Sequence, residues 1–212
     1  MRHERFPEEE FARLKKMLLV YEWGQKILMT KLEIIRESFE NFDEYNPIEH
    51  IHARMKAPES IAAKLKKLGF AVTAENAMRQ LYDVAGIRVI CPFARDIFRL
   101  AEILNSLPEM KVIKVKDYIA HPKPSGYRSY HMIMEVPVYY YGETENVPVE
   151  VQIRTQAMNF WATLEHMARY KYHESIPDHL SDELSLCAEK IAELDNRMFL
   201  IHDIITLINK EN

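Results

Sequence analysis

Apolar side chains recur at helical spacing at both ends of the chain. Between Glu8 and Phe39 they follow every three or four residues, and the polar segment NFDEYNP then ends the pattern. A second stretch runs from the capping residue Ser181 to about Asn209 and keeps two apolar positions in each heptad. We therefore expect long helices at both ends, the N-terminal one being either a single helix or a pair.

The central part of the chain alternates between short helical patterns and runs of β-branched and aromatic residues. Strands are predicted for GIRVIC, KVIKVKDYI, HMIMEVPVYYY and VPVEVQIRT. Helices bounded by start and stop signals are predicted from Pro58 to Gly69, from Thr73 to about Tyr82, from Arg95 to Leu107 and from Thr155 to Lys171. This order predicts an α+β fold with a mixed central β-sheet of about five strands, flanked by helices.

Composition narrows the class of protein without identifying it. The chain has 212 residues, of which 48% are hydrophobic and 28% charged, as in a globular protein with a sizeable core. Its formal net charge of -4 provides no overall attraction for nucleic acid, so a polyanion site has to be a local cluster of Lys and Arg. We divide the chain into an N-terminal helical segment (1–40), a central domain (41–175) and a C-terminal helix (176–212), all in one structural unit.

The cysteines and the N-terminal sequence indicate the cellular compartment in which we expect the protein. Cys91 and Cys187 lack metal-ligand spacing and are expected to be buried thiols in a reducing compartment. The charged start, MRHERFPEEEF, lacks the apolar region of a signal peptide, and no stretch approaches a spanning helix in length. We expect a cytoplasmic protein with no membrane partner.

Alternation in VPVEVQIRT assigns its polar side chains to one face of a strand. Because the valines and Ile153 point one way, Glu150, Gln152 and Arg154 point the other. That polar face is either solvated or part of a site. In the helix that follows, Asn159 and His166 lie a heptad apart and can turn back towards it.

Two further segments carry candidate chemistry. In YDVAGIRV, Asp83 precedes a strand. An aspartate at such a position commonly caps a turn. Together with Glu150, however, Asp83 forms a pair of carboxylates suited to Mg²⁺ beside a nucleotide. In HARMKAPESIAAKL, the polar side chains either form a solvated face or converge on phosphates near a helix N-terminus. These side chains are Arg54, Lys56, Ser60 and Lys64.

The segment HPKPSGYRSYH reads as a shaped loop. Prolines stiffen its approach, and Gly126 permits a backbone conformation that other residues avoid. The loop sets Tyr127 among Lys123, Arg128 and two histidines. Cations beside an aromatic ring suit a nucleotide.

Together, these motifs resemble the synthetase domain of the RelA/SpoT alarmone enzymes. The resemblance rests on RMKAPESIAAKL, YDVAGIRV, KVKDYIAHPKPSGYRSYH and VPVEVQIRTQAMNFWATLEHMARYKY, and the EYNPIEHI entry and helical tail are most similar to the RelQ type of small alarmone synthetase. It implies a nucleotidyltransferase-like synthetase fold in the central domain. It also implies transfer of the β,γ-pyrophosphate of ATP to the 3′-hydroxyl of GDP or GTP, which makes (p)ppGpp for the stringent response.

The resemblance also implies roles for individual residues. Asp83 and Glu150 match the Mg²⁺ carboxylates, and Glu150 also matches the group that accepts the 3′-hydroxyl proton. Arg54 and Arg88 match the two faces of the adenine clamp. The residues that match the ATP phosphate contacts are Lys56, Ser60 and Lys64. Tyr127 matches the ring that stacks on guanine, and its companions around GDP or GTP are Lys116, Lys123, Ser125, His131, Gln152 and Asn159.

Departures from the family pattern limit what is implied. Ser125 and Lys114 replace the usual Asn and Arg but remain polar or cationic, so the choice between GDP and GTP stays open. No HDxxED signature of the hydrolase half occurs, because His202 and Asp203 are followed by IITL. We expect synthesis without hydrolysis.

Two other functions remain open at this stage, a pyrophosphokinase acting on the 3′ end of tRNA and a non-catalytic RNA-binding module on the same fold. RelQ-type relatives imply a homotetramer with pppGpp as an allosteric ligand, and single-stranded RNA is a further candidate partner. The apolar seam of the C-terminal helix packs either on the N-terminal helix or on another copy of the chain.

Overall fold

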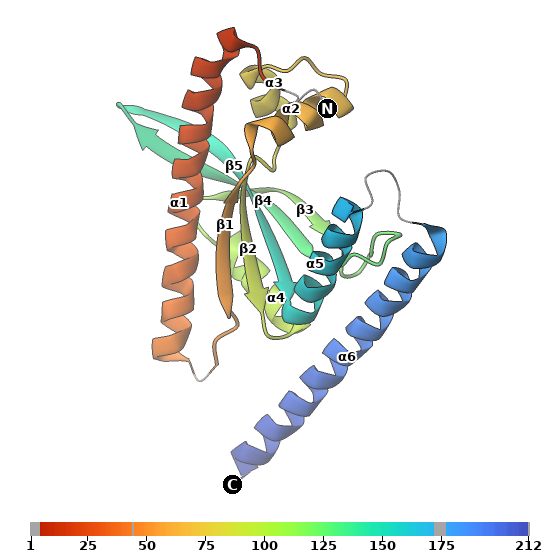
Figure 1. Cartoon of the computed structure of the whole chain (residues 1–212). Coiled ribbons are helices and arrows are strands. Elements are labelled where there is room, and N and C mark those ends of the chain that lie inside the picture. The colour runs from red at the N-terminus through yellow and green to blue at the C-terminus, as the bar shows by residue number, and fades with distance from the viewer. Residues whose placement is uncertain (1–4, 44, 172–176, 212) are drawn as a thin grey trace.

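The computed structural model describes residues 5–43, 45–171 and 177–211 as helices arranged around one β-sheet (Figure 1). A short 3-10 turn, Glu8–Glu10, leads into the first helix. The helices are α1 (Phe11–Phe42), α2 (Pro58–Lys67), α3 (Ala74–Gln80), α4 (Ala94–Asn105), α5 (Gln156–Lys171) and α6 (Asp178–Glu211). The strands are β1 (His50–Met55), β2 (Ala85–Cys91), β3 (Lys111–Asp117), β4 (Tyr130–Tyr140) and β5 (Glu143–Thr155).

The sheet has five strands in the order β1-β2-β5-β4-β3. Strand β2 pairs with β5 in parallel, whereas the other neighbouring pairs are antiparallel, so the sheet is mixed. The predicted α+β class and long terminal helices are therefore confirmed. The edge strand β1, which pairs with β2 alone, was not among the predicted strands. HIHARM does alternate apolar and polar residues, but Ile51 is its only β-branched residue, so the composition typical of a strand is weak.

The apolar face of the sheet forms the main core together with α1 and α4. Val147, Val149, Val151 and Ile153 on β5 are all at most 1% exposed, as their alternation predicted. Gly24 lets α1 approach this face, since a Cβ there would come within 3.1 Å of the Val147 Cβ. Packing on this side fixes the register of β5 and thereby aims its polar residues at the opposite face.

The ends of α2 and α3 follow the predicted signals. Helix α6 begins at Asp178, so Ser181, the predicted capping residue, lies within its first turn and that prediction is wrong. Pro58 opens α2, and Gly69 follows it with a φ of +80°. Thr73 caps α3 by accepting a hydrogen bond from the Asn76 backbone N–H at 3.2 Å. Cys91 is buried as expected, whereas Cys187 lies exposed on α6, so the prediction of two buried thiols is wrong for Cys187.

The C-terminal helix α6 packs mainly on α5, with a smaller contact on α4, and its C-terminal half extends beyond the sheet (Figure 1). Helix α1 packs on the sheet instead. The apolar seam of α6 is therefore largely uncovered, with Leu194, Met198, Ile201, Ile205 and Ile208 between 51% and 59% exposed. Among the described helices, none has the length and apolar character needed to cross a membrane.

Candidate active site

A row of polar side chains crosses the face of the sheet opposite α1. Strand register aligns one residue from each of the five strands in this row, in the order His52, Arg88, Gln152, His131 and Lys116. Glu150 lies two residues before Gln152 on β5 and therefore on the same face, where it pairs with Gly86 of β2. Buried polar residues on this face, Glu150 at 8% exposure and Arg154 at 4%, indicate a site rather than a solvated surface.

Asp83 lies at the entrance to β2 and accepts two charge-assisted hydrogen bonds. Its Oδ2 atom is 2.9 Å from Lys56 Nζ and 2.6 Å from Lys64 Nζ. Burial alone would raise the pKa of Asp83, but the hydrogen bonds from Lys64 and Lys56 outweigh it and hold that pKa below its usual value. Oδ1 is buried and has no hydrogen-bond partner among the described residues, so this carboxylate retains an acceptor atom for a ligand.

Glu150 faces the same pocket as Asp83. The pocket holds about 400 Å³, and its polar lining includes His52, Arg54, Lys56, Asp83, Arg88, Glu150 and Gln152. The Glu150 carboxylate is 3.2 Å from His131 Nδ1 through Oε1 and 2.8 Å from Gln152 Nε2 through Oε2. Burial opposes ionisation of Glu150, yet the hydrogen bonds from His131 and Gln152 keep its pKa below the usual value. Burial also lowers the pKa of His131, so at neutral pH a neutral imidazole donates to the carboxylate.

Tyr127 lies on the far side of His131 from Glu150. Its hydroxyl is 3.0 Å from His131 Nε2 and accepts a hydrogen bond from Arg154 Nη2. Lys123 Nζ lies 4.8 Å from the centroids of both the Tyr127 and Tyr118 rings. Burial is the main cause that lowers the pKa of Lys123, and repulsion from Lys116 lowers it further. The structure thus gathers cations and aromatic rings next to Glu150.

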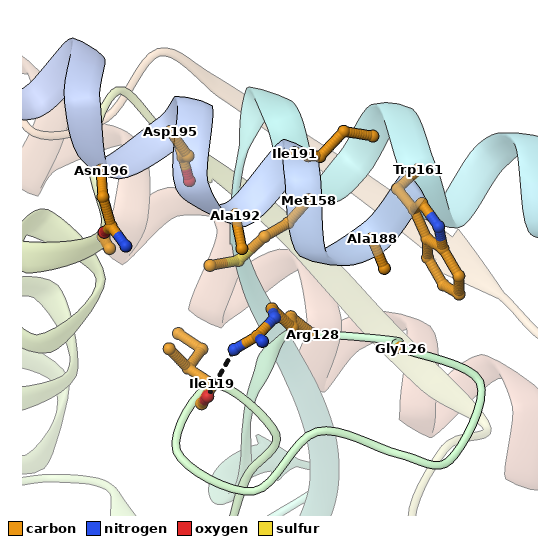
Figure 2. A pocket seen from close by; sticks show the side chains of 11 residues that line it. Ile119, Gly126, Arg128, Met158, Trp161, Ala188, Ile191, Ala192, Asp195 and Asn196 are labelled. Atoms are coloured by element: carbon orange, nitrogen blue, oxygen red, sulfur yellow. Dashed lines mark hydrogen bonds between the residues drawn. The ribbon is translucent and has the colours of Figure 1, made fainter. Parts of the chain in front are cut away.

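The loop that carries Tyr127 rests on the C-terminal helix. Gly126 has a φ of +84°, and a Cβ there would lie 2.5 Å from the Ala188 Cβ on α6. Nearby, Trp161 Nε1 donates to the Leu184 carbonyl at 2.9 Å, which ties α5 to the same turn of α6. Figure 2 shows the small, mostly apolar cavity between this loop and α6, where Arg128 donates to the Ile119 carbonyl at 3.1 Å. Helix α6 is therefore part of the support of the candidate site.

Three of the predicted site residues lie apart from the hydrogen-bonded cluster around Asp83 and Glu150. Ser60 is exposed on the first turn of α2, while Ser125 and Asn159 are half-buried. Within the described part of the chain, none of the three side chains makes a hydrogen bond to the cluster around Asp83 and Glu150. The Asn159 Oδ1 atom is buried and without a partner there, which leaves it as an acceptor for a ligand.

Sequence reasoning gave no role to Arg154 or Ser129. Arg154 Nε donates to the buried Ser129 Oγ at 3.2 Å, and Arg154 Nη2 donates to Gln152 Oε1 at 2.9 Å. The signal for Arg154 was available, because the alternation along β5 sets it on the same face as Glu150. Ser129 carried no such signal: it lies just before β4, and its Oγ donates to the Ile153 carbonyl on β5 at 3.3 Å.

Comparisons with known proteins show what this chain is similar to. A model of the region found in RelA/SpoT proteins matches residues 53–175. The GTP pyrophosphokinase YwaC of Bacillus subtilis is 43% identical over 184 residues, which are 87% of this chain and 88% of YwaC. The crystal structure of small alarmone synthetase 1 from Bacillus subtilis bound to its product pppGpp matches with a TM-score of 0.86 at 35% identity, covering 92% of this chain and 99% of that one.

A second crystal structure of small alarmone synthetase 1 from Bacillus subtilis, bound to AMPCPP, matches with a TM-score of 0.78 at 32% identity and covers 92% of this chain and 98% of that one. The family model spans more than half of the chain, and YwaC and this chain cover most of each other's length. The chain belongs to the RelA/SpoT family and is a small alarmone synthetase.

Proposed function

We propose that the chain transfers the β,γ-pyrophosphate of ATP to the 3′-hydroxyl of GDP or GTP and so makes (p)ppGpp and AMP. GTP pyrophosphokinase activity is what this branch of the family performs, and the assignment of residues to the reaction is our inference. One observation carries it: Asp83 and Glu150 line a single pocket, with cations on one side and the Tyr127 cluster on the other. A relative has been crystallised with pppGpp and, in a separate structure, with AMPCPP, which supports binding of both a guanine and an adenine nucleotide.

The donor nucleotide is assigned to the pocket that Asp83 and Glu150 share. Arg54 and Arg88 line it from neighbouring strands and can hold the adenine between guanidinium planes. Lys56 and Lys64 are already directed at Asp83 and can turn to the phosphates when ATP brings its own charge. Ser60, on the exposed first turn of α2, is assigned to the phosphates as well.

Mg²⁺ fits the two carboxylates. The described residues hold no group of three or more His, Cys, Asp or Glu that could bind a metal alone, which is consistent with an ion that takes few protein ligands and shares the rest with phosphate and water. The unpartnered Oδ1 of Asp83 and the neighbouring Glu150 would supply those ligands. When bound, Mg²⁺ would neutralise phosphate charge during the transfer.

Glu150 is assigned as the base that accepts the proton of the 3′-hydroxyl. It is ionised at neutral pH, because the hydrogen bonds from His131 and Gln152 outweigh the effect of burial and hold its pKa below the usual value. Phosphoryl-type transfer relies mainly on positioning and charge neutralisation, so this reaction needs no covalent nucleophile.

The acceptor nucleotide is assigned to the cluster beyond His131. The Tyr127 ring stacks on guanine, and Lys123 and Lys116 provide positive charge for its phosphates. The remaining acceptor contacts are assigned to Ser125, His131, Gln152 and Asn159.

We also propose a homotetramer in which pppGpp binds outside the active site and activates. The exposed apolar seam of α6 supports an assembly, because one chain leaves it uncovered. Single-stranded RNA remains a candidate ligand of such an assembly. The two free thiols support a reducing, cytoplasmic location.

A reaction with the purified protein, ATP and Mg²⁺ tests the activity. GDP, GTP or tRNA is offered separately, and AMP and the pyrophosphorylated acceptor are measured. AMP formation that depends on GDP or GTP is the expected result. Product formed only on tRNA, or on no acceptor, would contradict the proposal.

A further inference from the structure

Arg154 is the most buried cation of the candidate site, at 4% exposure on β5. Its guanidinium holds three different residues. Nε donates to Ser129 Oγ at 3.2 Å, Nη2 donates to Gln152 Oε1 at 2.9 Å, and Nη2 also donates to the Tyr127 hydroxyl. The Arg154 Cζ atom lies 5.0 Å from the centroid of the Tyr127 ring. A charge buried this deeply requires such partners.

The direction of these hydrogen bonds is fixed because a guanidinium can only donate. The Tyr127 hydroxyl therefore accepts from Arg154. The ionised Glu150 can only accept, so the neutral His131 carries its proton on Nδ1 and donates it to Glu150 Oε1 at 3.2 Å. His131 Nε2 is then an acceptor and receives the proton of the Tyr127 hydroxyl, 3.0 Å away. This first path runs from Arg154 to one oxygen of Glu150.

A second path starts from the same guanidinium nitrogen. Arg154 Nη2 donates to the carbonyl oxygen of the Gln152 side chain, which orients the amide so that Nε2 donates to Glu150 Oε2 at 2.8 Å. The two paths end on the two oxygens of one carboxylate. Arg154 thus sets the orientation of the Gln152 amide and the position of the Tyr127 hydroxyl and ring, while Glu150 sets the tautomer of His131.

We propose that Arg154 is a positioning residue for the acceptor nucleotide. It holds the Tyr127 ring and the Gln152 amide in the arrangement that receives the guanine nucleotide, which reduces the ordering required on binding. This inference rests on the proposed role of Tyr127 in acceptor binding. Arginine suits this role because its planar fork presents five N–H donors from three nitrogens in fixed directions, whereas a lysine presents its three donors from a single nitrogen.

Arg154→Met and Arg154→Lys test this role. Arg154→Met should raise the KM for GDP or GTP by about tenfold or more, as expected for losing hydrogen bonds to a charged group, and should leave the KM for ATP within about twofold. Arg154→Lys should recover part of the acceptor affinity. Arg99→Met is the control, because Arg99 contacts Asp43 and Phe39 outside the site.

Thermal unfolding and circular dichroism identify variants that fail to fold. If Arg154→Met does not fold, Tyr127→Phe removes only the hydroxyl that Arg154 holds and should raise the acceptor KM in the same selective way. Combining Arg154→Lys with Tyr127→Phe should raise the KM by less than the product of the single effects, since both changes break one path.

Two results would separate this inference from the proposed function. An unchanged acceptor KM in Tyr127→Ala would remove the proposed role of Tyr127. Two outcomes would overturn the role of Arg154 alone. One is weaker acceptor binding in Tyr127→Ala with an unchanged acceptor KM in folded Arg154→Met. The other is an equal rise of the acceptor KM and the ATP KM in Arg154→Met.

Discussion

The Asp83 carboxylate accepts hydrogen bonds from Lys56 at 2.9 Å and from Lys64 at 2.6 Å, so the acid at the entrance of β2 is neutralised by two of the cations assigned to the phosphates of ATP. These lysines come from the segment after β1 and from α2, and the acid precedes β2. Under the proposed assignment, Lys56 and Lys64 would contact the phosphates of bound ATP, and the Asp83 carboxylate would then be available to hold Mg²⁺. Without these ligands, the contact keeps the opposite charges paired.

Removing either carboxylate should therefore stop transfer while preserving the fold. Glu150→Gln keeps the size of the side chain but binds Mg²⁺ poorly and cannot accept a proton, so we expect a loss of rate of roughly 100-fold or more. Asp83→Asn should have a similar effect. Steady-state rates with ATP and GDP, together with circular dichroism, measure both expectations. Glu109→Gln, in an exposed contact with Lys31, is the control, and normal turnover in either site variant would exclude that residue from the mechanism.

Tyr127 should act through both its ring and its hydroxyl. From sequence alone, a stacking ring predicts that Tyr127→Phe keeps most activity, whereas the structure shows the hydroxyl between His131 and Arg154. We expect Tyr127→Ala to weaken acceptor binding about tenfold or more, as for a lost base stack, and Tyr127→Phe to weaken it less. Titration calorimetry with GDP and with an ATP analogue measures this. Equal losses in both variants would assign the effect to the hydroxyl alone.

The close contact between the loop that carries Tyr127 and helix α6 gives a steric prediction. Gly126→Ala should raise the acceptor KM, because a Cβ at a φ of +84° meets the Ala188 Cβ at 2.5 Å and has to displace the loop beside Tyr127. Gly69→Ala is a matched control, since it has a similar φ of +80° but no atom within 4 Å. Both variants lose stability from the backbone conformation, but only Gly126→Ala should lose acceptor affinity. A loss in Gly69→Ala of the same size would refute the steric explanation.

The sequence predicted which face of β5 carries the polar side chains better than it predicted the packing of α5 and α6 around them. Alternation along VPVEVQIRT was sufficient to set Glu150 and Gln152 on one face, because one face of β5 is packed by α1. In α5, however, the larger apolar residue Leu164 is 39% exposed, whereas the small Ala162 is 8% exposed. The contact of Gly126 with Ala188 joins residues far apart in the chain, and no local pattern reports such a contact. Small residues carry little hydrophobic signal, so periodicity alone does not select Ala162 and Ala188.

Asp195 on α6 should make stability depend on pH. Burial raises its pKa, and the hydrogen bond from Thr155 Oγ1 at 2.7 Å only partly offsets this. A carboxyl with a raised pKa in the folded state binds its proton more tightly there, so its contribution to stability is present at low pH and is lost as the pH rises from the unfolded pKa through the folded one. Asp195→Asn should keep the Thr155 contact and flatten this dependence. Chemical unfolding between mildly acidic and neutral pH tests it, and an unchanged slope in the variant would contradict the assignment.

The apolar seam of α6 should be an interface between copies of the chain. Ile201 and Ile205 are 51% and 52% exposed, so replacing them with aspartate removes little packing within one chain. We expect Ile201→Asp with Ile205→Asp to dissociate the assembly while circular dichroism and the melting temperature of the chain stay close to the original, because a buried charge in an apolar interface is strongly unfavourable. Light scattering at micromolar concentration gives the decisive mass: an original chain that is already a stable monomer would refute the interface, and a tetramer that persists in the double variant would place the interface elsewhere on the molecule.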